Sequence, residues 1–175
     1  MDRKADCSVA VSALREGKLP LRVTHNDTKL NNILIDEETQ EGICVIDLDT
    51  TMPGLSIYDF GDSIRFGANH SAEDEKDLSK VNFDIELYRI YTRGFLEGAQ
   101  GGLTDEELEY LPWGAKLMTL ECGIRFLTDY LDGDNYFHIH YEGQNLDRCR
   151  TQFKLVSDME AQWDEMHAIV REIAK

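Results

Sequence analysis

His25-Asn26-Asp27-Thr28-Lys29-Leu30-Asn31-Asn32 and, shortly after it, Val45-Ile46-Asp47-Leu48-Asp49 are the two stretches that decide the fold. The first has the spacing H-x-D-x-x-x-x-N, and the second places an Asp directly after an apolar run. This layout is typical of a phosphoryl-transfer site, where one Asp accepts the proton of the attacking hydroxyl. An Asn and a second Asp then hold the Mg²⁺ that bridges the nucleotide phosphates. The pattern therefore predicts Asp27 as the catalytic base and Asn32 and Asp47 as the metal and nucleotide ligands.

Two more residues belong to this predicted site. His25 completes the catalytic loop, where we expect it to brace the backbone by hydrogen bonding more than to transfer protons. Asp49 follows Asp47 by two residues, so on a strand the two side chains share one face. Asp49 is therefore expected to be a further metal ligand, directly or through water.

A β-hairpin is predicted between the two stretches. Residues 33–35 and 43–46 are apolar and strand-like, and the segment between them, residues 36–42, is polar and ends in a glycine. Such a pattern is typical of two antiparallel strands and their turn. The hairpin brings Asn32 and Asp47 back toward each other, so that both reach one ion.

Beyond Pro53-Gly54 the apolar spacing changes to that of helices. We expect one helix from a cap at Asn82, another after the capping box of Thr104 and Glu107, and a long final helix over residues 146–175. The predicted fold class is mainly α with a small β-hairpin. The predicted organisation is a single domain, residues 1–175, with a catalytic loop at 23–32, a metal-binding hairpin at 33–49 and a helical subdomain at 71–175.

Composition excludes several classes of function. The chain has 175 residues and a net charge of −16, and no stripe of Lys and Arg, so we expect no nucleic-acid partner and no anionic membrane partner. No segment is apolar enough to span a bilayer, and the N-terminal residues 1–7 lack the apolar region of a secretory signal, which favours a cytoplasmic location. The four cysteines are far apart, and we expect them to be reduced, with Cys44 buried in a strand.

The motifs together resemble a known family. Residues 25–32, 45–49 and 58–65 resemble the aminoglycoside phosphotransferase and choline kinase superfamily, whose members are small-molecule relatives of protein kinases. Residues 23–32 and 44–50 look most like the N-acetylhexosamine 1-kinases, and the likeness continues through residues 123–131 and 133–137. The resemblance implies ATP as phosphoryl donor, Mg²⁺ as cofactor, and the anomeric hydroxyl of an N-acetylhexosamine as acceptor.

The resemblance also implies acceptor-binding residues. Arg125 and Tyr136 would contact the sugar, and Trp163 would line its pocket. The side-chain chemistry agrees, because Arg donates hydrogen bonds to sugar oxygens and aromatic rings stack on the apolar face of a pyranose. Asp59-Phe60-Gly61 spells the metal-binding tripeptide of protein kinases, but Asp47 already occupies the metal position, so we interpret Asp59 and Asp62 as hydrogen-bonding partners of the catalytic loop.

One part of the family pattern is lacking. No G-x-G-x-x-G phosphate loop occurs, and no upstream strand carries a suitable Lys. The chain therefore looks like the C-terminal lobe of a protein-kinase-like (α+β) fold, with the N-terminal nucleotide lobe of the same kinase as its missing partner. Such a lobe alone is expected to have little or no activity.

Two alternatives remain open from the sequence. The acceptor of the same chemistry is alternatively choline, ethanolamine or an aminoglycoside, and cationic acceptors favour acidic or aromatic cages. The chain is alternatively a non-catalytic helical binding module derived from such a kinase. The intact Asp27, Asn32 and Asp47 count against the second alternative.

Overall fold

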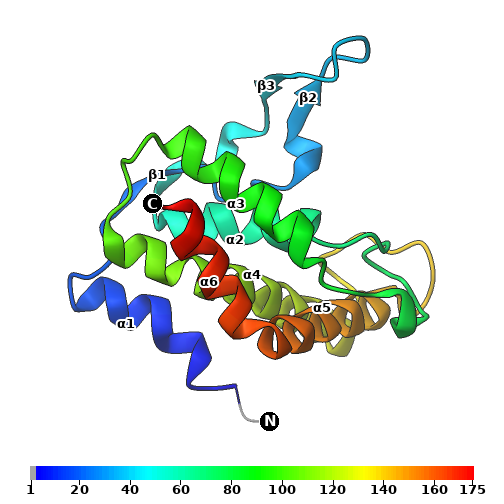
Figure 1. The fold of residues 1–175 in the computed structure, drawn as a ribbon. Coiled ribbons are helices and arrows are strands. Elements are labelled where there is room, and N and C mark those ends of the chain that lie inside the picture. Colours follow the sequence, from blue (N-terminus) through cyan, green and yellow to red (C-terminus); the bar gives the residue numbers. More distant parts are fainter. Residues whose placement is uncertain (1–2) are drawn as a thin grey trace.

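Helices make up most of the computed structural model, which describes residues 3–175 (Figure 1). Within this range six α-helices follow one another along the chain: α1 Val9–Arg15, α2 Ser56–Gly67, α3 Ile85–Ala99, α4 Asp105–Leu131, α5 Gln144–Ala161 and α6 Trp163–Ile173. A 3-10 turn, Asp6–Ser8, precedes α1, and further single turns lie between the helices: Leu30–Asn32, Leu48–Thr50 and Leu78–Lys80. No helix of the described residues is both long and apolar enough to cross a membrane.

Two small antiparallel sheets flank the catalytic loop. Strands β2 (Ile33–Ile35) and β3 (Gly42–Val45) form the predicted hairpin, with Ile33 opposite Val45, and it projects away from the helices (Figure 1). Strands β1 (Arg22–Thr24) and β4 (Met52–Gly54) form the second sheet. The predicted class, mainly α with a small β-hairpin, is confirmed, whereas the pairing of β4 with β1 was not foreseen.

The core forms where α2 and α4 cross. Gly61 of α2 and Gly114 of α4 lie at this crossing, and a Cβ on Gly114 would overlap the backbone of Ile57. The missing side chains let the two backbones approach closely. Apolar side chains from both helices, Ile57, Phe60, Leu111 and Ala115 among them, are then almost fully buried around the contact. This packing fixes α2, whose first turns support the catalytic loop.

Helix boundaries follow local capping more than the apolar pattern. The capping box of Thr104 and Glu107 is present at the start of α4, as predicted. Helix α3 is capped by Asp84, whose carboxylate accepts two backbone N–H groups, so the predicted cap at Asn82 is wrong by two residues. The predicted long final helix is also wrong, because the chain turns at Gln162 and separates α5 from α6.

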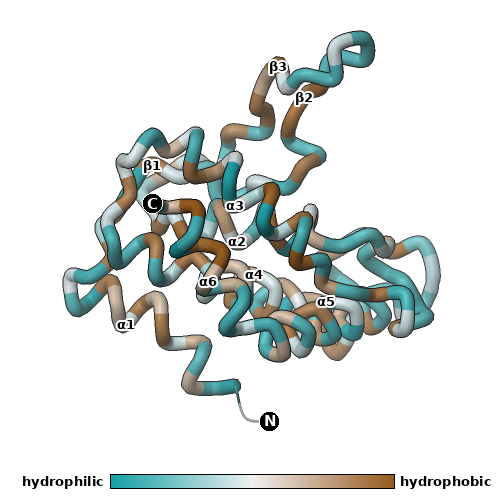
Figure 2. The backbone as a smooth tube through the Cα atoms, viewed as in Figure 1, coloured by the Kyte–Doolittle hydropathy of each residue, from teal (hydrophilic) through white to brown (hydrophobic). Residues whose placement is uncertain are grey.

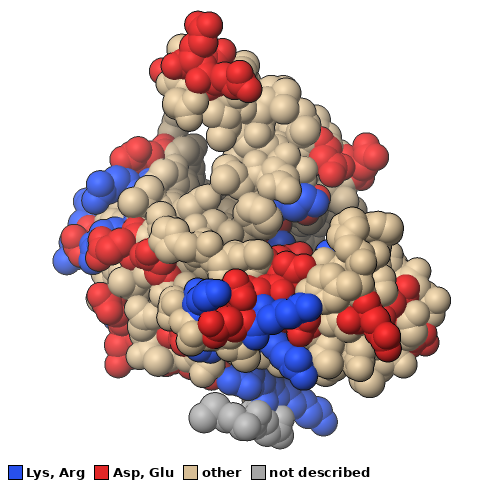
Figure 3. Space-filling view, turned by 90° about the vertical axis from the view of Figure 1, so that its right-hand side faces the viewer, with Lys and Arg blue, Asp and Glu red and all other residues tan. Residues whose placement is uncertain are grey.

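Much of the hairpin is exposed. Its apolar strands stand out from the polar turn in Figure 2, and acidic side chains gather at its tip in Figure 3. Ile43 is 64% exposed and Val45 is 52% exposed. The prediction that Cys44 is buried is wrong, because no helix of the described chain covers this hairpin, although Cys44 is a free thiol as expected.

Candidate active site

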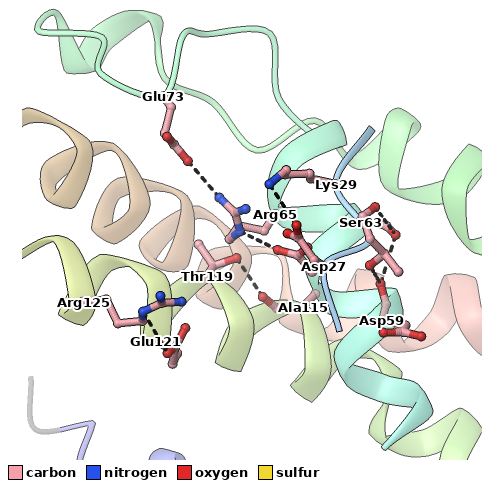
Figure 4. Close-up of polar contacts among 12 residues, drawn as sticks. Asp27, Lys29, Asp59, Ser63, Arg65, Glu73, Ala115, Thr119, Glu121 and Arg125 are labelled. Carbon is pink, nitrogen blue, oxygen red and sulfur yellow. Dashed lines mark hydrogen bonds and ion pairs between the residues drawn. The ribbon is translucent and has the colours of Figure 1, made fainter. Parts of the chain in front are cut away.

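The catalytic loop begins where β1 ends, and helix α2 holds its backbone. The carboxylate of Asp59 accepts hydrogen bonds from the backbone N–H groups of His25 and Asn26, both at 2.8 Å. Thr28 donates its hydroxyl to the backbone carbonyl of Asp59, and Ser63 donates to the carbonyl of Thr28. The interpretation of Asp59 as a support of the loop agrees with these contacts, and Figure 4 shows Asp59 and Ser63 on α2 beside the loop.

Asp27 lies at the centre of the loop with its carboxylate oriented by two donors. Lys29 donates from Nζ to Oδ2 at 2.9 Å, and Asn32 donates from Nδ2 to the same oxygen at 2.8 Å. Burial raises the pKa of Asp27, but these hydrogen bonds and the charge of Lys29 outweigh it, and the pKa lies below its ordinary value. Asp27 is therefore ionised at neutral pH, and its Oδ1 has no hydrogen-bond donor among residues 3–175.

His25 ties the loop to the hairpin. Its Nε2 lies 2.9 Å from the carbonyl oxygen of Ile46, and its Nδ1 accepts the backbone N–H of Asp27 at 3.3 Å. This pair of contacts requires the tautomer with the proton on Nε2. With both ring nitrogens engaged by the backbone, His25 braces the loop as expected.

Asn32 lies next to the segment that carries Asp47. The backbone N–H of Ile46 donates to the carbonyl oxygen of Asn32 at 2.9 Å, which joins the two predicted metal-binding segments. Asn32 is 6% exposed, and its Nδ2 donates to both the backbone carbonyl and the carboxylate of Asp27. Its side-chain oxygen therefore points away from Asp27 and has no donor in the described chain.

Asp47 and Asp49 are exposed and unpaired among the described residues. Asp47 has a left-handed backbone with φ of 61°, and Asp49 lies in the 3-10 turn that follows. The expectation that both lie on one face of a strand is wrong, because β3 ends at Val45. No three His, Cys, Asp or Glu side chains of residues 3–175 are grouped closely enough to hold a metal ion by themselves. A metal at Asp47 thus needs the amide oxygen of Asn32 and ligand oxygens from elsewhere.

A cleft of about 580 Å³ opens beside Asp27. It is lined by the loop, α2, α4 and the segment before α5, and both Arg125 and Tyr136 face it. Arg125 donates to the Tyr136 hydroxyl at 3.4 Å, and its guanidinium lies 5.2 Å from the ring centre of Phe137. The structure thus brings two of the three predicted acceptor-binding residues to the same cleft as Asp27.

Trp163 lies elsewhere. Its ring packs edge to face against Trp113, with centroids 4.9 Å apart, and against His167 on its own helix. It does not line the cleft. The spacing of Trp163 on an amphipathic helix is that of a residue packed on the core, which is where the structure places it.

The site also depends on residues that the sequence did not single out. Lys29 lies two residues after Asp27 within the quoted motif, and its position there was the available signal. Asp129, buried in α4, accepts the backbone N–H groups of three consecutive residues, 135 to 137, and so holds the loop that carries Tyr136. No sequence pattern identifies Asp129, because its partners depend on the turn after α4.

Charged side chains are balanced around the cleft. Four carboxylates line it, and four cationic side chains lie among them: Asp27, Asp62, Glu73 and Glu121, with Lys29, Arg65, Arg125 and Arg148. Each carboxylate has a cationic partner within 4 Å, as in the pair of Asp62 with Arg65 at 2.9 Å. Asp62 thus bonds within α2 and not with the catalytic loop, contrary to the interpretation from sequence.

The fold, mainly helical with a small hairpin, is that of a kinase-like protein. Residues 3–94, just over half of the chain, match the sequence model of the phosphotransferase enzyme family (APH). The chain belongs to this family.

Proposed function

We propose that the chain is the acceptor- and metal-binding lobe of an ATP-dependent small-molecule kinase. The observation that carries the proposal is the arrangement around Asp27, where one carboxylate oxygen is held by Lys29 and Asn32 and the other is free beside a cleft. In phosphoryl transfer most of the rate acceleration comes from positioning and charge stabilisation. A fixed, ionised carboxylate next to an acceptor cleft supplies the positioning.

Asp27 orients the acceptor hydroxyl in this proposal. Its free Oδ1 accepts the hydroxyl hydrogen, which directs a lone pair of the hydroxyl oxygen toward the phosphoryl group. Because the pKa of Asp27 is lowered, the carboxylate is a weak base and takes the proton late, as the new P–O bond forms. Lys29, paired with Asp27, adds positive charge at the place where the transferred phosphoryl group arrives.

Asn32 and Asp47, with Asp49 beside them, fit the requirements of a Mg²⁺ site. All three offer oxygen atoms that no described residue occupies, and hard Mg²⁺ prefers oxygen ligands completed by water and phosphate. When bound, Mg²⁺ supplies positive charge that neutralises the nucleotide phosphates. The backbone hydrogen bond from Ile46 to Asn32 holds Asn32 next to the segment of Asp47 and Asp49 without the ion.

The balanced charge of the cleft favours an uncharged acceptor over a cationic one. Choline, ethanolamine and aminoglycosides bind where carboxylates or aromatic cages are in excess. Here every lining carboxylate is already paired with a lining cation. Arg125 offers hydrogen-bond donors and Tyr136, 73% exposed, offers a ring face, which together suit a pyranose. We therefore propose the anomeric hydroxyl of an N-acetylhexosamine as the acceptor.

The exposed apolar surface around the hairpin supports a nucleotide-binding lobe as partner. Most of the large apolar side chains that are exposed within residues 3–175 lie between residues 21 and 52, next to Asp27 and Asp47. Val23 is 84% exposed and Leu48 is 59% exposed. A concentration of exposed apolar side chains of this kind marks an interaction site. A lobe bound there would close over the metal site and bring ATP to it.

The test is phosphoryl transfer from Mg²⁺–ATP to a panel of acceptors. We expect the chain, mixed with a separately expressed nucleotide-binding lobe from another family member, to phosphorylate N-acetylglucosamine or N-acetylgalactosamine. The chain alone is expected to be far slower. Equal rates with and without the added lobe would contradict the two-lobe proposal. Preference for choline or an aminoglycoside would contradict the acceptor, and absence of both nucleotide and acceptor binding would favour a non-catalytic module.

A further inference from the structure

Arg65 is a buried cation that faces the acceptor cleft. It lies in the last turn of α2, its side chain is 9% exposed, and it lines the same cleft as Asp27. Figure 4 shows its guanidinium between Glu73 and the pair formed by Asp27 and Lys29. Nothing in the phosphoryl-transfer chemistry described above uses it.

Two of its three nitrogens are fixed by carboxylates. Nε donates to Asp62 at 2.9 Å, and Nη1 donates to Glu73 at 3.0 Å. These two contacts, from different segments of the chain, set the plane of the guanidinium. Because an Arg fork is planar and rigid, the direction of the third nitrogen is set as well.

The third nitrogen, Nη2, is open to the cleft. It donates no hydrogen bond to any described residue. It is also absent from the small set of fully enclosed polar atoms without a partner, which are Asp62 Oδ2, Tyr88 Oη and Gln152 Oε1. Nη2 is thus not enclosed by protein, and the cleft beside Asp27 is the cavity that Arg65 lines.

The local charge decides what this nitrogen binds. Arg65 is compensated by two carboxylates, and the second oxygen of Asp62 is buried without a donor. The positive charge of Arg65 is therefore already compensated, so Nη2 offers no unbalanced charge to a carboxylate or phosphate group of the ligand. An uncharged oxygen, a hydroxyl or an amide carbonyl, accepts from Nη2 without adding charge.

We infer that Arg65 is a specificity-determining residue that donates from Nη2 to one uncharged oxygen of the acceptor, next to the hydroxyl that Asp27 orients. The inference rests on the proposed function for the existence of an acceptor in this cleft. It adds a discriminating contact that Arg125 and Tyr136, both exposed, do not provide. A site that holds a buried donor for one oxygen rejects ligands that lack this oxygen, because the donor is then left unpaired.

The experiment measures binding, so that it does not depend on turnover. Dissociation constants are determined by ligand-observed NMR for N-acetylglucosamine and for a series of analogues that each lack one hydroxyl or the acetamido carbonyl. The proteins are the wild type, Arg65→Lys and the control Arg150→Lys. Lysine keeps the charge beside Asp62 but not the fork, and Arg150 is exposed and outside the cleft. Thermal unfolding of each variant is recorded alongside.

We expect Arg65→Lys to bind the full acceptor about 10- to 100-fold more weakly, the range of a hydrogen bond from a charged donor. The analogue that lacks the oxygen bound by Arg65 should bind the wild type as weakly as the full acceptor binds Arg65→Lys. Its affinity should not fall further in Arg65→Lys, and this analogue identifies the oxygen involved. Arg150→Lys should behave as the wild type. A uniform loss across all analogues, or no loss, would overturn the inference and leave the proposed function intact.

A second measurement covers the case in which Arg65→Lys unfolds. In wild-type protein labelled with ¹⁵N at arginine, the Nε–H resonance of Arg65 should shift when the full acceptor is added and not with the one discriminated analogue. An unchanged resonance in the presence of bound acceptor would overturn the inference. If the wild type binds no member of the series, both the inference and the proposed acceptor class are wrong.

Discussion

Asp27 shows how a single side chain acquires a role from its neighbours. Its carboxylate is surrounded by Lys29 and Asn32, which keep it ionised, and His25 fixes the backbone before it. In an open loop without such donors, the side chain of an Asp would change rotamer or accept hydrogen bonds from nearby backbone N–H groups. Asp59, in the tripeptide Asp59-Phe60-Gly61, has a different role. Both of its carboxylate oxygens accept hydrogen bonds from the backbone of the loop, which leaves it a structural support.

Replacing Asp27 by Asn should slow phosphoryl transfer strongly while leaving acceptor binding nearly intact. The amide keeps the shape of the side chain but cannot take the proton, so we expect kcat to fall about 10²-fold or more. The measurement is steady-state kinetics of the chain with its nucleotide-binding lobe. Glu37→Gln, in the exposed hairpin turn, is the matched control. Retention of wild-type kcat in Asp27→Asn would remove Asp27 from the reaction.

At the scale of elements, the contact between α2 and α4 positions the site. Helix α2 carries Asp59 and Arg65, and helix α4 carries Arg125 and Asp129, so their separation sets the width of the cleft. The contact depends on small residues at the crossing more than on matched apolar stripes. Helix α4 is buried on several sides, which obscures any single apolar face.

Gly114→Ala should destabilise the protein because its Cβ would overlap the backbone of Ile57 and force the helices apart. We expect a loss of about 1–3 kcal/mol in the free energy of unfolding, the usual cost of overpacking. Gly98→Ala in α3 is the control, since nothing lies within 4 Å of its Cβ position. That control should be neutral or more stable by up to about 1 kcal/mol. Urea unfolding measures both, and equal stabilities would contradict this account of the crossing.

At the scale of the whole molecule, partly buried ion pairs join segments that are distant in sequence. Glu107 at the start of α4 is 1% exposed and binds Arg22 of β1 and Ser56 of α2. Glu160 in α5 binds Arg3 and Lys116. These two carboxylates hold the first and last parts of the described chain to its central helices.

Stability should therefore fall in acid as these two carboxylates are protonated. Burial raises the pKa of Glu107, but hydrogen bonds from Arg22, Thr104 and Ser56 outweigh this effect and lower the pKa to about 2. The hydrogen bond from Arg3 is the main cause that lowers the pKa of Glu160 to about 2. Because both values lie below the unfolded value of 4.5, the contribution is complete above pH 4.5 and is lost between about pH 4.5 and 2.

For Glu107 the contribution is on the order of 3 kcal/mol. Glu107→Gln should lower stability at pH 7 and flatten the acid limb of a plot of urea midpoint against pH. Glu37→Gln, exposed and outside the ion pairs formed among residues 3–175, should leave the slope as in the wild type. An unchanged slope in Glu107→Gln would show that this carboxylate does not hold the segments together.

The sequence by itself determined the class of the fold and predicted the candidate catalytic loop. Three features depend only on residues close in sequence, and so can be recognised without the structure: the spacing from His25 to Asn32, the apolar run before Asp47 and the helical pattern after Gly54. The predicted capping box at Thr104 held for the same reason, because both of its partners lie within one turn.

Only the tertiary structure decided what lies around the candidate catalytic residues. The break at Gln162, the exposure of Cys44, the distance of Trp163 from the cleft and the open nitrogen of Arg65 all depend on contacts between segments far apart in sequence. Burial and hydrogen-bond partners are properties of such contacts, and a residue's spacing along one helix does not fix which neighbour it meets. Helices α2 and α4, which cross at two glycines, both line the cleft beside Asp27.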